Sequence, residues 1–582
     1  MIANVDPVEQ EIQYRYSRWR NSDLPSYLMK ELHEMKVTEI MDCFYRKPSL
    51  GMEGIVSKVG VGTNRLNIFT VRHICQALSY EIVSRGLVSQ HRVIVISYDS
   101  RLHSRSFAEQ AALVLANNNI KVYLFDHPRP ASELAFSVRW LHAIAGLNFS
   151  AGRLSPQYHG LQIFSDYGCL VSDSYITRVQ TYMDQIGDGL DIEVLPAEEA
   201  IATGKLAMVG TEIDKAYIEY MENTPLSRES IQIMGSSMRV VLAPLFGTGG
   251  GIIGRAFAAL GYTEIHQTEV RDSETVSLAR APDPHQLEVL LPAYHLARTI
   301  QADIVLGFNP EENELSLSVK DGKGGYLLLH ASQTAALLLH YIIQSREAMN
   351  NLPLGGIVVK TLLCSDLLNG MAADHGLQLI ESTQGFQGIG AKMAECERTG
   401  KQAFVFGFDE YGGYALGNFV RGRDGIHAAL LVAEMAANYK AKGSTVYQEL
   451  LKLYEKYGWF AEERIILSFA DVNWWQQSGI LMDRISIESP MIVGGLTAVK
   501  FHDYRNGEVR DLIKQRSTSL AHAPAYALKF ELMGGSWYGV RITKDIPEIE
   551  LVVGSRHPEE KACKYQLSAI RSDVLHMIES II

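Results

Sequence analysis

Unbroken apolar runs of strand length alternate with apolar residues at helical spacing over the first two thirds of the chain. The runs are rich in β-branched residues, as in Arg92-Val-Ile-Val-Ile-Ser97, and they predict buried strands. Strands and helices that alternate in this way predict parallel sheets with both faces covered, which is the α/β class. We expect strands at residues 92–97, 121–125, 239–243 and 303–306, and helices at 106–117, 253–260 and 334–343.

The two ends of the chain follow other patterns. Residues 10–41 have helical spacing and predict a helical lead-in. Near the other end, three short apolar runs at 495–501, 527–532 and 548–553 predict strands, and residues 565–581 predict a closing helix. This arrangement indicates a small α+β domain at the C-terminal end.

The length of 582 residues suggests about four domains. Boundaries are expected where the sequence turns polar or glycine-rich, near residues 215 and 325 and within 460–490. The predicted domains are residues 1–215, 216–325, 326–465 and 466–582.

Charge and cysteine usage exclude several classes of protein. Lys and Arg number 54 against 66 Asp and Glu, a formal net charge of −12, and an acidic chain repels nucleic acid. A local basic cleft for a small phosphorylated ligand stays compatible with this balance. No apolar run reaches 18 residues and the first residues are polar, so neither a membrane partner nor a secretory signal is predicted. Six scattered cysteines without C-x-x-C spacing predict buried free thiols and a cytoplasmic location.

Four loops rich in Gly, Pro, Asn or Asp follow predicted strands, one in each predicted domain. Ligands of α/β sheets usually bind at such loops. The second loop is typical of an oxygen-ligand cation site and the fourth of an anion-binding turn, although loops of this composition are more often purely structural. The loops are residues 149–156, 307–314, 406–413 and 540–548.

Motifs around these loops give a more specific indication. Examples are Gly60-Val-Gly-Thr-Asn-Arg-Leu-Asn67, Tyr98-Asp-Ser-Arg101, Phe406-Gly-Phe-Asp-Glu410 and Gly417-Asn-Phe-Val-Arg421. With them the chain resembles the α-D-phosphohexomutase superfamily over nearly its whole length, closest to the phosphoglucomutase/phosphopentomutase branch. The resemblance implies three mixed or parallel α/β domains and a C-terminal α+β domain around one cleft, with one functional loop from each. It also implies phosphoryl transfer within a sugar phosphate through a phosphoserine and Mg²⁺.

The loop that would carry the phosphoserine departs from the family pattern T-A-S-H-N-P. Aligned through Tyr158 and Gly160, the chain places Gly152 where the serine belongs and Arg153 where the histidine belongs. Glycine has no side chain and cannot form a covalent intermediate. Ser150 and Ser155 are the nearby hydroxyls that could substitute.

The metal loop also departs from its pattern, D-P-D-A-D-R. Asn309 and Asn313 replace two aspartates, Glu311 replaces the third, and Glu314 replaces an arginine. Mg²⁺ prefers anionic oxygens in a close octahedron, so two neutral amides weaken the site. No cofactor is therefore expected. The alternatives at this loop are a solvated acidic turn and a weak cation site of Asn309, Glu311 and Glu312.

The phosphate loop, R-P-S-G-T-E-P-K in the family, retains Arg541 and Thr543. Lys544 replaces the glycine that lets the backbone approach a phosphate, and carboxylates enter at Asp545 and Glu548. Carboxylates beside a dianionic phosphate are repulsive.

The sugar loop is the best preserved of the four. Asp409 and Glu410 stand where the family uses two glutamates to bind sugar hydroxyls, while Tyr411 fills the position of a small residue. The expected substrate-binding residues are Asp409, Glu410, Arg541, Thr543 and Lys544.

Three hypotheses follow from these losses. The first is a mutase-derived pseudoenzyme that binds a sugar-like small molecule or a protein partner in a regulatory role. The second is an enzyme repurposed for another sugar-like or phosphorylated substrate in the same cleft. The third is an active phosphohexomutase with an unusual nucleophile. Phosphoryl transfer depends almost wholly on positioning and charge neutralisation, so joint loss of the nucleophile, the metal carboxylates and cationic contacts favours the first hypothesis.

Overall fold

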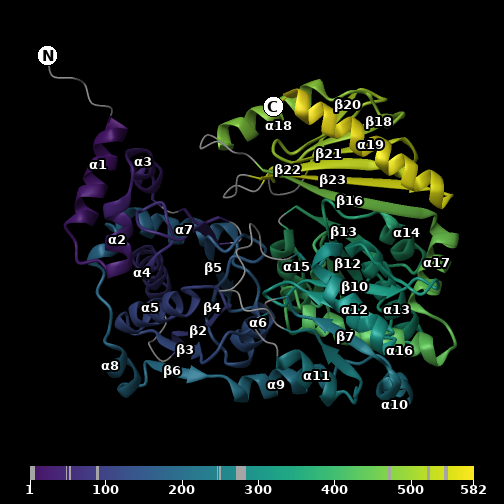
Figure 1. The fold of residues 1–582 in the computed structure, drawn as a ribbon, viewed down its shortest axis with the longest axis horizontal. Coiled ribbons are helices and arrows are strands. Elements are labelled where there is room, and N and C mark those ends of the chain that lie inside the picture. Colours follow the sequence, from purple (N-terminus) through teal and green to yellow (C-terminus); the bar gives the residue numbers. More distant parts are fainter. Residues whose placement is uncertain are drawn as a thin grey trace.

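Four sheets make up the fold of the protein, seen in a computed structural model (Figure 1). The structure describes residues 7–47, 49–51, 54–86, 91–245, 247, 251–269, 283–383, 385–468, 474–520, 525–542 and 548–581. Figure 1 shows the N-terminal helices and the first sheet on the left and the C-terminal sheet at the upper right.

The first sheet has the order β1-β5-β4-β2-β3-β6. Its inner strands β2, β3, β4 and β6 are parallel, whereas β5 is antiparallel to β4 and to β1. The predicted helical lead-in forms α1 (Pro7–Arg20), α2 (Ser26–Glu34) and α3 (Val37–Phe44). The strands are β1 (Ile55–Lys58), β2 (Val93–Tyr98), β3 (Lys121–Phe125), β4 (Ala145–Phe149), β5 (Tyr158–Ser165) and β6 (Leu206–Val209), and the helices α4 (Ile68–Ser84), α5 (Ser104–Asn117), α6 (Ala131–Trp140), α7 (Asp173–Gln185) and α8 (Ala197–Ala202).

The second and third sheets repeat this mixed design. The second has the order β11-β10-β9-β7-β8 and the third β13-β12-β14-β15, and in each the later strands turn antiparallel. The second contains β7 (Val240–Ala243), β8 (Ile265–Gln267), β9 (Ile304–Phe308), β10 (Leu315–Lys320) and β11 (Tyr326–Leu328), with α9 (Thr211–Glu222), α10 (Arg228–Met234), α11 (Ile252–Ala259) and α12 (Leu291–Ile300). The third contains β12 (Ile357–Thr361), β13 (Gln378–Ser382), β14 (Phe404–Phe408) and β15 (Tyr414–Ala415), with α13 (Ala331–Ala348), α14 (Leu367–Asp374), α15 (Gly385–Thr399), α16 (Gly425–Ala441) and α17 (Val446–Tyr457).

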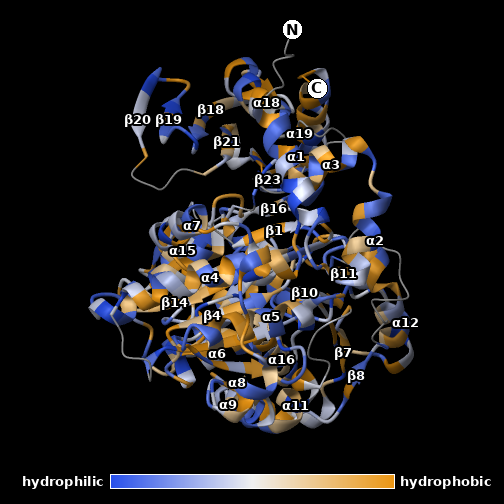
Figure 2. Cartoon of the chain, turned by 90° about the vertical axis from the view of Figure 1, so that its left-hand side faces the viewer, coloured by the Kyte–Doolittle hydropathy of each residue, from blue (hydrophilic) through white to orange (hydrophobic). Residues whose placement is uncertain are grey.

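The C-terminal sheet is antiparallel, with the order β16-β23-β22-β21-β18-β19-β20 and β17 paired to β18. Its first strand begins at Trp459, so the predicted boundary at 465 falls inside β16. The β19–β20 hairpin is hydrophilic and lies at the free edge of the sheet (Figure 2). The strands are β16 (Trp459–Ser468), β17 (Ile492–Val493), β18 (Leu496–Asp503), β19 (Glu508–Asp511), β20 (Arg516–Ser519), β21 (Ala527–Leu532), β22 (Trp537–Ile542) and β23 (Glu548–His557), and the helices α18 (Trp474–Glu488) and α19 (Glu560–Ile581).

The apolar core of the described residues consists of several clusters. One continuous cluster joins the three α/β domains, for example through Phe125, Leu306 and Phe406. The C-terminal domain has a cluster of its own, centred on residues such as Phe530 and Tyr538. A smaller cluster crosses between the third and C-terminal domains, where Leu362 and Leu363 pack with Trp537.

Each of the four predicted loops connects a strand to the antiparallel strand that follows it. The loops join β4 to β5, β9 to β10, β14 to β15 and β22 to β23. Residues 543–547 of the fourth loop lie outside the described residues. The other three turns can project beyond the ends of their sheets, so three sheets can bring three turns to one place. Across the part of the chain that the structure describes, no helix is long and apolar enough to cross a membrane.

Candidate functional site

The first three loops meet at two points. A Cβ atom added at Gly152 would lie 3.7 Å from Oε2 of Glu311, so the β4–β5 loop faces the β9–β10 loop. Glu314 forms a backbone bridge with Gly413, which joins the β9–β10 loop to the β14–β15 loop. The structure thus brings together the predicted nucleophile, metal and sugar loops.

Arg101 fixes the β4–β5 loop. Its guanidinium donates to the backbone oxygens of Gly152 and Leu154, both at 2.7 Å, and to those of Ser155 and Tyr158 at 3.1 and 3.2 Å. Gly152 has a φ of +54°, in the left-handed region that favours glycine. The loop is therefore rigid, and a backbone turn occupies the position predicted for the nucleophile.

The two candidate hydroxyls of this loop have different surroundings. The hydroxyl of Ser150 accepts a hydrogen bond from the Gly152 amide at 3.1 Å, and the side chain of Ser150 also contacts Glu311. Ser155 is buried, and its hydroxyl has no hydrogen-bond partner in the structure as described. Ser150 is therefore the hydroxyl that faces the next loop.

The metal loop pairs several of its own polar groups, although Oε1 of Glu311 and Oε2 of Glu314 are buried without a hydrogen-bond partner among the described residues. Nδ2 of Asn309 donates to Oδ1 of Asn313 at 2.8 Å, and Nδ2 of Asn313 donates to Oε2 of Glu311 at 2.6 Å. Oδ1 of Asn309 accepts from the backbone amides of Asn313 and Glu314, both at 3.1 Å. All four side chains are buried.

This donor set does not fit the Mg²⁺ that the resemblance implies. The Asn313 amide group covers a carboxylate oxygen that a cation would need, and amide N–H groups cannot bind a cation. Burial raises the pKa of Glu311, because the charged carboxylate is less well solvated there than in water. Among the described residues, no group of three or more His, Cys, Asp or Glu side chains could hold a metal ion.

Glu314 and Arg153 neutralise each other's charge. Nε of Arg153 lies 3.4 Å from Oε1 of Glu314. Burial raises the pKa of Glu314 to about 7, and the guanidinium of Arg153 opposes that rise. The two residues that the sequence marked as separate departures are therefore an ion pair between the first and second domains.

Tyr411 lies at the centre of the site, enclosed by arginine side chains. The guanidinium of Arg153 lies 3.4 Å from the centroid of the Tyr411 ring, and three further guanidinium groups lie within 6.0 Å. The hydroxyl of Tyr411 donates to Oε2 of Glu550 at 2.6 Å. The other three arginines are Arg423, Arg464 and Arg541.

Both predicted sugar-binding carboxylates are already engaged. Oδ2 of Asp409 accepts from Nε of Arg423 at 2.6 Å, and its Oδ1 accepts from the backbone amides of Tyr411 and Gly413. Oε1 of Glu410 lies 2.5 Å from Nη1 of Arg541. Arg541, the predicted phosphate ligand, is thus bound by carboxylates of the chain, while Thr543, Lys544 and Asp545 lie outside the described residues.

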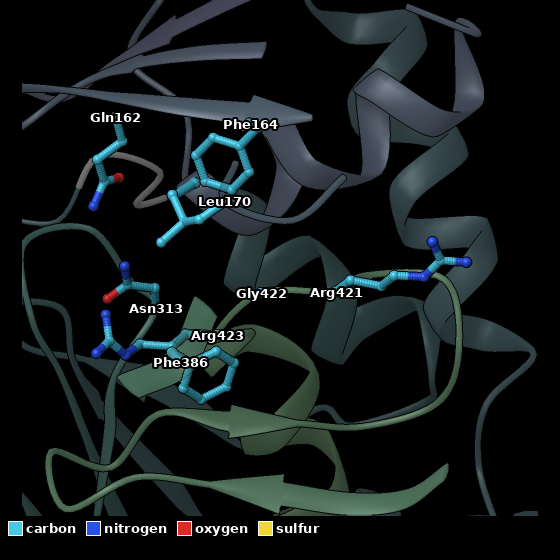
Figure 3. A pocket seen from close by; sticks show the side chains of 9 residues that line it. Gln162, Phe164, Leu170, Asn313, Phe386, Arg421, Gly422 and Arg423 are labelled. Atoms are coloured by element: carbon cyan, nitrogen blue, oxygen red, sulfur yellow. The ribbon is translucent and has the colours of Figure 1, made fainter. Parts of the chain in front are cut away.

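A small cavity of about 30 Å³ lies beside the metal loop (Figure 3). Its polar lining includes Gln162, Asn313 and Arg423, and its apolar lining includes Phe164 and Phe386. Such a volume holds a water molecule or two, but not a sugar phosphate.

Models of three family domains match 376 of the 582 residues. They are described as phosphoglucomutase/phosphomannomutase, alpha/beta/alpha domains I, II and III, and match residues 47–189, 215–322 and 330–454. The chain belongs to the phosphoglucomutase/phosphomannomutase family. The predicted superfamily and the predicted fold class are therefore confirmed.

Similar members of the phosphoglucomutase/phosphomannomutase family cover most of the chain. A phosphoglucomutase of Staphylococcus epidermidis is 27% identical over 508 residues, which are 87% of this chain and 90% of that protein. A phosphoglucomutase of Staphylococcus aureus is 25% identical over 535 residues, 91% of this chain and 94% of that protein.

Solved structures of the family show the same fold. A putative phosphomannomutase from Thermus thermophilus covers 92% of this chain and 99% of its own, with 17% identity and a TM-score of 0.67. The open form of Paramecium parafusin covers 92% and 95%, with 14% identity and a TM-score of 0.66.

Sequence reasoning in terms of family motifs missed part of the site. Arg423, Arg464 and Glu550 lie outside the four motifs, although all three contact Tyr411. The signal that could have found them was Tyr411 itself, because a large side chain at a small-residue position must contact something new.

Proposed function

We propose that this family member does not carry out the phosphosugar mutase reaction and acts as a binding or regulatory protein. The observation that carries the proposal is the meeting of Gly152 with Glu311, where the first and second loops face each other. Transfer through the protein needs a nucleophile there and a cation to neutralise the phosphoryl group. The residues offer neither.

The charges around Tyr411 support the same proposal. A dianionic sugar phosphate entering there would have to displace carboxylates that already neutralise the arginines. Five carboxylates pair with four arginines in this network. The carboxylates are Asp283, Glu314, Asp409, Glu410 and Glu550, and the arginines are Arg153, Arg423, Arg464 and Arg541.

The direct test is a mutase assay on the full chain. The protein is incubated with glucose 1-phosphate, glucose 1,6-bisphosphate and Mg²⁺, and the glucose 6-phosphate formed is measured through a coupled dehydrogenase. The Staphylococcus epidermidis phosphoglucomutase serves as the active control. We expect no product above background and no phosphorylated protein by intact mass. Product formation that Ser150→Ala abolishes would overturn the proposal, because it identifies Ser150 as the nucleophile.

A repurposed enzyme is the second candidate, and Glu314 favours it. The pKa of about 7 lets this buried carboxyl exchange a proton near neutral pH, as a general acid or base must. A thermal-shift screen with free sugars, sugar phosphates and nucleotides separates the two candidates. A stabilising compound whose turnover is lost in Glu314→Gln supports an enzyme, and stabilisation without turnover supports a binding protein.

A further inference from the structure

Polar contacts tie the C-terminal domain to the others at the cleft. Arg464 of β16 pairs with Asp283, Arg541 of β22 with Glu410, and Glu550 of β23 with the hydroxyl of Tyr411. The C-terminal domain has a main apolar core of its own and shares a smaller apolar cluster with the third domain through Leu362 and Leu363, so these polar contacts add to that apolar contact.

Tyr411 contacts side chains from all four domains. Arg153 of the first domain covers its ring, and Nε2 of His285 in the second donates to its backbone oxygen at 3.0 Å. Arg423 of the third lies 6.0 Å from the ring centroid, and Glu550 of the fourth accepts from its hydroxyl.

The ring also contacts four cations. Four guanidinium groups lie between 3.4 and 6.0 Å from one ring centroid, where the π electrons of the ring stabilise cations. Each of these arginines also pairs with a carboxylate, so the ring adds to a network whose charges are already balanced. Loss of the Tyr411 side chain removes the ring contacts and the hydrogen bond to Glu550 together.

We propose that Tyr411 is an interdomain clasp that helps to hold the C-terminal domain against the other three. Its loss leaves each domain folded but lets the C-terminal domain move about the apolar cluster that it shares with the third domain. This inference concerns conformation, so it holds or fails independently of the mutase assay.

Spin labels on the full chain can measure the movement. All six native cysteines are buried, so exposed engineered cysteines are labelled selectively. Val37 on α3 and Ile487 on α18 are 71% and 80% exposed, and Figure 1 shows these helices well apart, one on the first domain and one on the C-terminal domain. The two spin labels are attached to Val37→Cys and Ile487→Cys, and electron–electron double resonance measures the distance between them.

The clasp predicts one narrow distance distribution with Tyr411 present, and a second, longer population of at least one fifth of the molecules in Tyr411→Ala. Tyr414→Phe is the matched control, because it loses a buried hydroxyl bond to the Ala331 oxygen inside the third domain. The control should keep the narrow distribution. A narrow distribution in Tyr411→Ala, or an equal second population in Tyr414→Phe, would overturn the proposal.

Tyr411→Phe provides a second measurement if the alanine variant folds poorly. It retains the ring but loses the bond to Glu550. We expect backbone amides of the loops at 309–314 and 409–413 to exchange with deuterium at least ten times faster, with unchanged exchange in the C-terminal core. Exchange as slow as in the native chain, or acceleration spread evenly over all domains, would refute the clasp.

Discussion

Gly152→Ser places a serine where the family has its nucleophile. We expect this variant to fold without gaining mutase activity. An added Cβ would lie 3.7 Å from Oε2 of Glu311, an ordinary contact, so no clash forms. The left-handed φ of +54° costs a non-glycine residue about 1–2 kcal/mol. A hydrogen bond from the new hydroxyl to Glu311 offsets about 1 kcal/mol of that, so the melting temperature should fall by only about 1–3 °C.

The kinetic deficit follows from the groups that are still missing. Losing a single electrostatic donor to a transition state costs about 100- to 1000-fold in rate. The variant lacks both the cation of the metal loop and arginines free to bind phosphate, so kcat/KM should stay at least about 10⁴-fold below that of an active phosphoglucomutase. The coupled glucose 6-phosphate assay measures this deficit.

Gly204→Ser is the matched control for backbone strain. Gly204 has a φ of +69° with nothing within 4 Å of an added Cβ, and it lies in the turn between α8 and β6, outside the four loops. Gly204→Ser has no such hydrogen bond, so it should lose about 1 kcal/mol more stability than Gly152→Ser. Mutase activity of Gly152→Ser within tenfold of an active family member would refute the reasoning, because it would show that the metal and phosphate loops still work.

Further predictions concern pH, ion pairing and metal. Burial lowers the pKa of His159 to about 4, so the unfolded chain takes up a proton at higher pH than the folded chain does. The free energy of unfolding from thermal melts should therefore fall by about 3 kcal/mol between pH 6.5 and 4, and His159→Gln should remove this fall. Arg153→Met should cost about 3 kcal/mol above pH 7, where Glu314 is ionised, and less at pH 6; if adding Glu314→Gln does not restore most of the loss, the two residues are not coupled. Mg²⁺ should leave the melting temperature of the native chain unchanged but raise that of Asn309→Asp with Asn313→Asp, and a shift in the native chain would contradict the amide pairing.

Much of the fold could be predicted because local patterns decide it. The runs at 92–97 and 303–306 form β2 and β9, and the C-terminal pattern at 548–553 forms part of β23. The antiparallel strands after the first three loops, β5, β10 and β15, were not predicted, because an apolar run does not reveal the direction of its neighbour.

The site was predictable position by position but not as a network. The sequence marked Arg153 and Glu314 as separate departures from the family, whereas the structure pairs them across two domains. Such pairing depends on contacts between residues far apart in the chain, which no local pattern encodes. Tyr411 shows the same limit, because its partners come from four domains.

The pairing of Arg153 with Glu314 has an evolutionary consequence. Reversion of either residue alone toward the family pattern leaves the other buried charge without its partner, at a cost of several kcal/mol. A protein holds only about 5–15 kcal/mol of stability, so a single step back is strongly penalised. The two positions are therefore expected to change together in related chains rather than one at a time.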